Sequence, residues 1–186
     1  MAGNYVLRGE MEVGSELALK KDGHFEFMLA YGAADYWAKG TWRLDGNSVV
    51  LQSAGKKEEP IKFLRSEAGK PGRIRVWVLG QDGKGVEHIH VHLLTKGEPL
   101  EAMTSEDGAA VFPDDPGAKA IAFEVRVYQV EAGPFDMKTS DKDYYFALNG
   151  DAITQVLFEN EKLGVDGSTL IMKHWGEDHP MRYERE

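Results

Sequence analysis

Apolar and polar residues alternate along most of the chain, in short segments such as His24–Phe27, Ile74–Val78 and Phe123–Tyr128. A period of two residues puts successive side chains on opposite faces, which is typical of strands with one buried face. Turn dipeptides separate these segments about every eight to twelve residues. Asp-Gly or Asn-Gly, which supply the positive φ angles of tight hairpins, stand at 22–23, 45–46, 82–83, 107–108, 149–150 and 166–167. The pattern therefore predicts an all-β protein with about a dozen strands.

Helical periodicity is nearly absent. The best helical candidate is Ala152–Lys162, where apolar residues recur at Ile153, Val156 and Leu157. The same residues also fit a strand that follows Asn149-Gly150 as the turn of a hairpin. We expect the strand, because the residues before that turn alternate as well.

The middle of the chain, residues 72–130, forms a self-contained strand pattern. It contains Asp82-Gly83-Lys84-Gly85-Val86 before an alternating strand, and then Thr104, Asp107-Gly108 and Phe112 in a T-x-x-D-G-x-x-x-F arrangement. This third of the chain resembles the carboxypeptidase regulatory-like domain, a prealbumin-like β-sandwich. The resemblance implies a sandwich over residues 70–132 that serves as a non-catalytic accessory module.

The two ends of the chain carry motifs that belong to one kind of meander. Gly3-Asn4-Tyr5, Asp22–Phe25 and Gly40-Thr41-Trp42 follow one another in a meander that resembles small lipocalin-like barrels of bacterial proteins, and Tyr183-Glu184-Arg185 resembles their closing strand. Because closure removes exposed strand edges, we expect residues 3–66 and 143–185 to close one barrel or curved meander, with the sandwich inserted. Two sequential units are the alternative.

Three histidines share one face of a predicted strand over Glu87–His92. His88, His90 and His92 alternate with apolar residues and would lie about 6–7 Å apart. Neutral imidazole is the commonest protein ligand for metals, and two or three converging nitrogens would hold zinc or copper. The alternative is a polar strand face without a metal. We otherwise expect no cofactor.

Four aromatic residues, Tyr31, Tyr36, Trp37 and Trp42, gather in or beside the loop around residues 31–35. In a lipocalin-like barrel such side chains can line an apolar cavity, and Tyr and Trp make good anchors at its mouth. More often, such aromatic residues simply fill a small barrel core. The first interpretation predicts a ligand site built from these four residues.

Two loops carry weaker signals. The loop His174–Pro180 holds two histidines and two acids, which would suit a metal or an acid/base pair. Asp114–Gly117, beside Glu106-Asp107, offers oxygen ligands for Ca²⁺ but lacks calcium-loop spacing. We favour solvated loops in both places.

Composition excludes several classes of protein. The 186 residues include no cysteine, so disulfide scaffolds, thiolate zinc sites and cysteine nucleophiles are ruled out. The net charge of −9 argues against nucleic-acid binding, and the apolar runs are too short to span a membrane. A phosphate-binding glycine loop, a nucleophile elbow and an H-E-x-x-H motif are all absent. We therefore expect a protein that is not an enzyme.

These observations predict a non-enzymatic binding or accessory protein whose partner is a small molecule or a protein. A metal-binding protein and a module that pairs edge strands with a partner protein are the alternatives. The residues Met1–Tyr5 do not begin an intact signal peptide, so the chain is either cytoplasmic or a mature form. The two resemblances favour a bacterial periplasmic or extracellular protein.

Overall fold

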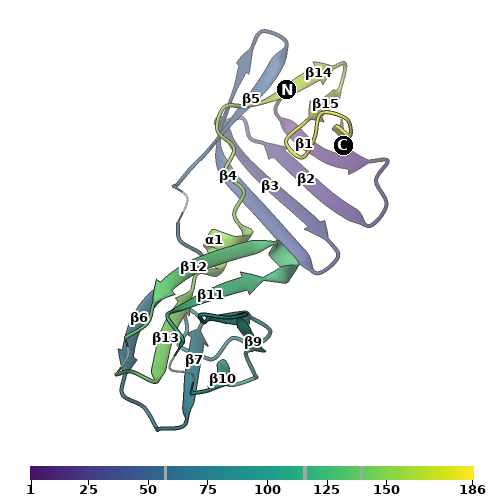
Figure 1. Cartoon of the computed structure of the whole chain (residues 1–186). Coiled ribbons are helices and arrows are strands. Elements are labelled where there is room, and N and C mark those ends of the chain that lie inside the picture. Colours follow the sequence, from purple (N-terminus) through teal and green to yellow (C-terminus); the bar gives the residue numbers. More distant parts are fainter. Residues whose placement is uncertain (57, 115–116, 139) are drawn as a thin grey trace. The chain divides into compact units, whose positions relative to one another are not determined.

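The computed structural model describes residues 1–56, 58–114, 117–138 and 140–186 and divides the chain into two compact units (Figure 1). Residues 1–57 and 154–186 form the first unit, and residues 58–153, which lie between them in the sequence, form the second. Each unit is built almost entirely from strands, which confirms the all-β prediction.

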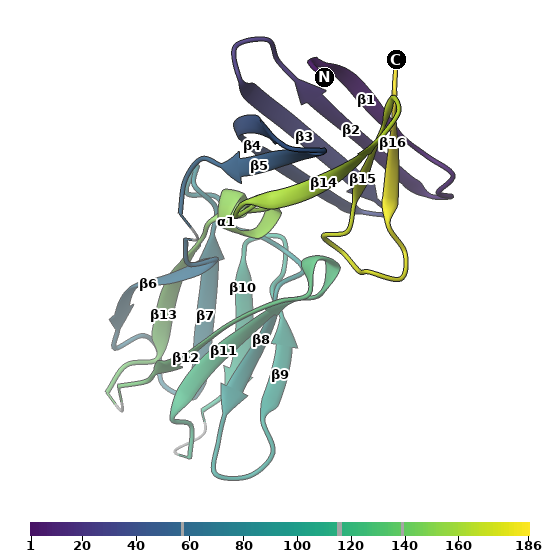
Figure 2. The ribbon, with the colours of Figure 1, turned by 90° about the horizontal axis from the view of Figure 1, so that it is seen from above.

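The first unit is a closed barrel in which every neighbouring pair of strands is antiparallel. The N-terminal and C-terminal strands complete it together, and Figure 2 shows the last strand beside the first. A barrel was predicted, and the structure confirms it. In order around the barrel, its strands are β1 (Gly3–Arg8), β16 (Met181–Arg185), β15 (Thr169–Met172), β14 (Glu161–Asp166), β5 (Ser48–Ser53), β4 (Ala34–Asp45), β3 (His24–Tyr31) and β2 (Val13–Leu19).

Large side chains fill the barrel interior. The alternating residues of each strand point inward, and Phe25, Phe27 and Tyr183 are almost fully buried. Phe158, in the segment between the short helix Gly150–Thr154 and the strand Glu161–Asp166, is also fully buried in this core. Gly40 allows β4 and β5 to come close, because a Cβ there would lie 2.0 Å from the carbonyl oxygen of Gln52. The barrel is therefore a packed core over most of its length.

The second unit consists of two four-stranded sheets that share one core. Phe123 of one sheet and Phe146 of the other meet edge to face, with ring centroids 4.6 Å apart. A short 3-10 turn, Arg126–Tyr128, follows β11. The first sheet has the order β10 (Ala109–Pro113), β7 (Arg73–Leu79), β13 (Asp143–Leu148), β6 (Ile61–Glu67), and the second has the order β12 (Val130–Asp136), β11 (Ala120–Val125), β8 (His90–Leu94), β9 (Leu100–Met103).

Two strands that the sequence analysis assigned to the barrel belong to the second unit instead. β6 pairs with β13, and β13 pairs in parallel with β7. The physical reason is burial: Ile61 and Phe146 are buried in the core of the second unit. Alternation identified these segments as strands but carried no information about the sheet that each one joins.

The expected hairpin at Asn149-Gly150 is wrong. Residues Gly150–Thr154 form a short helix, α1. The side-chain oxygen of Asn149 accepts a hydrogen bond from the backbone N–H of Ala152 at 3.3 Å, as an N-cap residue does. Of the residues between α1 and β14, Gln155 makes one isolated bridge, to Trp37, and no regular strand forms there. Within the described ranges no helix is long and apolar enough to cross a membrane.

Candidate functional site

A pocket of about 330 Å³ opens at one end of the barrel. Its lining comes from strand ends that the register places together, since Val13 at the start of β2 pairs with Tyr31 at the end of β3. Met181 at the start of β16 and Tyr36 near the start of β4 join them. The β1–β2 and β15–β16 loops complete the rim.

The inner part of the pocket is apolar because of strand alternation. Val13, Leu29 and Tyr31 have the same parity as the core residues of their strands, and Leu29 pairs with Tyr36 across β3 and β4. Leu29 and Met181 are nearly buried and form the floor, whereas Tyr31 at the strand end is 59% exposed. The pocket is therefore the open end of the barrel interior.

Trp175, in the loop between β15 and β16, covers part of this opening. Its ring stacks on Phe27, with centroids 5.8 Å apart and an interplanar angle of 22°, and meets Phe158 edge to face at 6.5 Å. The neighbouring His174 is fixed by a contact of 3.1 Å between its Nδ1 and Oε2 of Glu161. Trp175 is still 47% exposed, so one part of the indole is held by the core and another part borders the pocket.

Two ionisable side chains, Glu10 and His179, complete the lining. Both are exposed. Across the described parts of the chain, neither of them has a hydrogen bond or an ion pair with another side chain. Their polar atoms are therefore available to a ligand.

The structure brings together two of the four aromatic residues predicted to bind a ligand. Tyr31 and Tyr36 line the pocket. The Trp37 indole instead donates to Oγ1 of Thr154 at 3.1 Å. The Trp42 indole donates to the carbonyl oxygen of Lys20 at 2.8 Å, in the β2–β3 turn at the opposite end of the barrel. Neither tryptophan lines this pocket.

Sequence reasoning missed Trp175 as a pocket residue. In the sequence, the loop His174–Pro180 suggested only metal or acid/base chemistry. Its two histidines separate in the structure, because His174 contacts Glu161 while His179 lines the pocket. The available signal was an apolar indole in an otherwise polar loop, which indicates a side chain that folds back onto apolar surface.

The histidine face differs from the predicted strand at its first member. β8 begins at His90, and His88 precedes it with a φ of 64° and a side chain that is 70% exposed. A left-handed residue breaks the two-residue alternation. His88 is therefore not part of the series on β8 that holds His90 and His92.

His90 and His92 are both engaged with carboxylates. Nδ1 of His90 lies 2.7 Å from Oε1 of Glu101, and Nε2 of His92 lies 3.7 Å from Oε2 of Glu124. Arg126 joins the two acids through contacts of 2.9 Å to Glu101 and 3.0 Å to Glu124. The hydrogen bond from His90, with the nearby Arg126, lowers the pKa of Glu101. Among the described residues, no three His, Cys, Asp or Glu side chains are grouped so that they could hold a metal ion.

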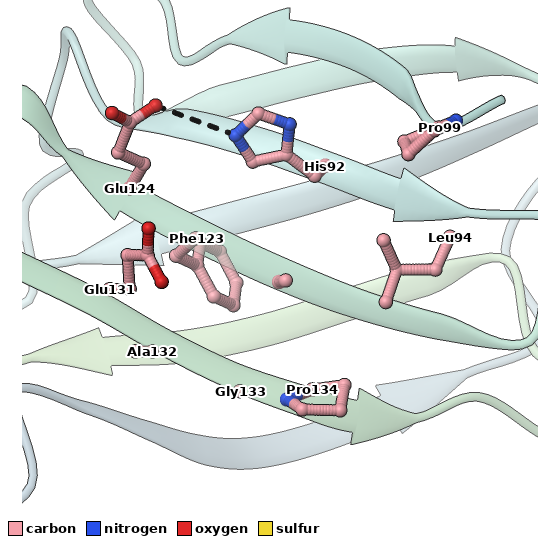
Figure 3. Close-up of a pocket in the computed structure, with 10 residues that line it drawn as sticks. His92, Leu94, Pro99, Phe123, Glu124, Glu131, Ala132, Gly133 and Pro134 are labelled. Atoms are coloured by element: carbon pink, nitrogen blue, oxygen red, sulfur yellow. Dashed lines mark ion pairs between the residues drawn. The ribbon is translucent and has the colours of Figure 1, made fainter.

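A second pocket, of about 590 Å³, lies beside this network on the outer face of β8, β11 and β12 (Figure 3). His92 and Glu124 face each other at one end of it, and Gly133 and Pro134 line the β12 side (Figure 3). Since His92 and Glu124 already contact each other, and Glu124 also binds Arg126, these polar groups are largely satisfied within the protein. The pocket at the barrel mouth is the better candidate for a ligand.

The segment Asp114–Gly117, for which we favoured a solvated loop over a Ca²⁺ site, includes Asp115 and Pro116, which lie outside the described residues. Its first residue, Asp114, accepts a hydrogen bond from Nζ of Lys142 at 2.6 Å.

Comparisons with family models, curated proteins and solved structures found no match to this chain. Function is therefore inferred from the site itself.

Proposed function

We propose that this is a non-enzymatic binding protein that takes a small, largely apolar molecule at the mouth of the barrel. The observation that carries the proposal is that inward-facing residues of the barrel line a pocket that opens to solvent. Val13, Leu29 and Tyr36 belong to the interior series, yet they line an open pocket. Binding of a ligand that removes such apolar surface from water is favourable.

The pocket sets the size of the ligand. Its volume of about 330 Å³ lies at the lower end of the range for small-molecule sites. Since one water occupies about 30 Å³ of the liquid, the pocket holds a ligand of roughly ten non-hydrogen atoms. At about 0.4–0.7 kcal/mol of binding free energy per non-hydrogen atom, which lies within the bounds for small ligands, such a molecule binds with a Kd on the order of 10 μM to 1 mM.

In this proposal the second unit is an accessory module. The resemblance of residues 72–130 to the carboxypeptidase regulatory-like domain supports that role, and with the lipocalin-like motifs of the barrel it favours a periplasmic or extracellular bacterial protein. Zinc or copper binding at His88, His90 and His92 stays a prediction, as does edge-strand pairing with a partner protein. Metal content after purification without a metal column tests the first of these.

The proposal is tested by NMR titration of the full chain with indole, a neutral probe of suitable size. We expect chemical-shift changes at Val13, Leu29 and Met181 that saturate with added indole. Val13→Trp should fill the pocket and abolish them, whereas Val111→Trp, at a half-exposed strand position of the second unit, should not. Thermal unfolding of both variants checks that they fold. Shift changes confined to the pocket of Figure 3 would contradict the proposal.

A further inference from the structure

We propose that the ligand at the barrel mouth is an organic cation, a quaternary ammonium or protonated amine with a small apolar body. This inference rests on the proposed function and names the class of molecule that the pocket selects. It depends on three features of the pocket: its aromatic rim, its free carboxylate and the charge of the loops around it.

The rim is aromatic on several sides. Tyr31, Tyr36 and Trp175 come from three different segments of the chain and line the same pocket. The face of an aromatic ring carries partial negative charge and attracts a cation, most strongly when the ring is an indole. Several rings around one opening are the arrangement that recognises quaternary ammonium groups in other proteins.

Glu10 adds a full negative charge to the same rim. The structure pairs it with no cation among the described residues, whereas Glu177 in the β15–β16 loop lies 2.7 Å from Nζ of Lys173. Of the described residues that line the pocket, His179 is the only basic one, and none is a lysine or an arginine. An anionic ligand would therefore meet an uncompensated carboxylate, and a cationic ligand would compensate it.

The loops around the mouth have the same sign of charge. The β1–β2 loop carries Glu10 and Glu12, and the β15–β16 loop carries Glu177 and Asp178 against Lys173, with His174 and His179 counted as neutral. A concave site surrounded by one sign of charge concentrates ligands of the opposite sign. The apolar floor of Leu29 and Met181 then receives the uncharged body of the cation.

The test compares choline with its neutral isostere, in which carbon replaces the quaternary nitrogen, by titration calorimetry and NMR on the full chain. Indole serves as the neutral aromatic probe. We expect choline to bind at least about tenfold more tightly than the isostere, which corresponds to the sum of a cation–π and a carboxylate contribution.

Variants locate the effect. Glu10→Gln should weaken choline binding by about two- to fivefold and leave the isostere unchanged. Trp175→Leu should weaken choline binding by about five- to thirtyfold, and Trp175→Phe, which keeps an aromatic face, should restore most of it. Glu184→Gln, an equal change of net charge on an exposed strand position of the barrel, should have no effect.

The outcomes separate the two proposals. If the isostere binds as tightly as choline, or if indole binds and choline does not, the cation inference is wrong while the proposed function stands. The inference is also wrong if choline binding ignores both Glu10→Gln and Trp175→Leu. If choline, isostere and indole all fail to bind, the proposed function fails as well.

Discussion

Phe158 is the residue whose truncation should damage the barrel most. Its side chain is fully buried, although it lies in a segment without regular strand structure. Its ring centroid is 5.2 Å from that of Phe27 and 6.0 Å from that of Phe25. Its backbone is held at both polar atoms, because its N–H donates to Oγ of Ser53 and its carbonyl accepts from the Ser53 N–H. These contacts fix both the backbone and the side chain of Phe158 in the barrel core.

The magnitude follows from cavity formation. Truncation of a buried phenylalanine to alanine costs about 3–5 kcal/mol, and lost aromatic pairs add about 0.5–1.5 kcal/mol each. We expect Phe158→Ala to lie at the upper end of the first range. Phe158→Leu, which keeps most of the volume, should cost about 1–2 kcal/mol and lower the Tm by about 5–15 °C.

Urea unfolding followed by near-ultraviolet circular dichroism measures these losses. Leu44→Ala is the control, because Leu44 belongs to the same barrel and is 56% exposed, and it should change stability by less than about 0.5 kcal/mol. Added benzene should partly restore the stability of Phe158→Ala, since benzene binds in empty apolar cavities left by a truncated core side chain. A loss below about 1 kcal/mol for Phe158→Ala would refute the placement of Phe158 in the core.

Three further predictions concern polar groups that the fold buries. Burial raises the pKa of Tyr183 to about 12, so its contribution to stability is complete below pH 10 and is lost as the pH rises toward 12. Urea unfolding at pH 9 and at pH 11 measures this loss. Between these two pH values, the free energy of unfolding of wild type should fall by about 1 kcal/mol more than that of Tyr183→Phe. Arg75→Met should destabilise the second unit by about 3–5 kcal/mol in chemical denaturation, because the buried carboxylate of Asp143 loses the guanidinium that binds it through Nε at 2.7 Å. The double variant Arg75→Met with Asp143→Leu should recover most of this stability. If it does not, burial of an unpaired charge is not the cause of the loss. Thr104→Val should lower the free energy of unfolding by about 1–3 kcal/mol, since the buried Oγ1 of Thr104 accepts a hydrogen bond from the Ile89 N–H at 2.9 Å. Amide hydrogen exchange at Ile89 should also become faster. Unchanged exchange at Ile89 would contradict this role of Thr104.

Local pattern was enough to predict most of the strands. Segments such as Phe25–Phe27 and Ile74–Val78 alternate because one face of each is buried, and burial acts residue by residue along the strand. The partner of a strand is decided by contacts far away in the sequence. β6 and β13 illustrate this, because their alternation fits either unit and only the core formed around Phe146 decides between them.

The candidate site shows the same division. Tyr31 and Tyr36 were predicted because they lie beside a β-turn at a barrel mouth, which is local information. Trp175 was missed because its place depends on Phe27, about 150 positions earlier in the sequence. His88 left the predicted series because a single positive φ angle changes the direction of a side chain, and a histidine does not signal that angle in advance.

The most direct test of the barrel-mouth site is to locate a bound cation by intermolecular nuclear Overhauser effects. Choline added to isotope-labelled protein should show contacts from its methyl groups to the rings of Tyr31, Tyr36 and Trp175 and to the methyl groups of Leu29. These residues line one pocket, so the contacts should appear together and should disappear together in Val13→Trp. Contacts from bound choline to His92, Ala132 or Pro134, with none to the barrel residues, would place the ligand in the other pocket and contradict the proposed site.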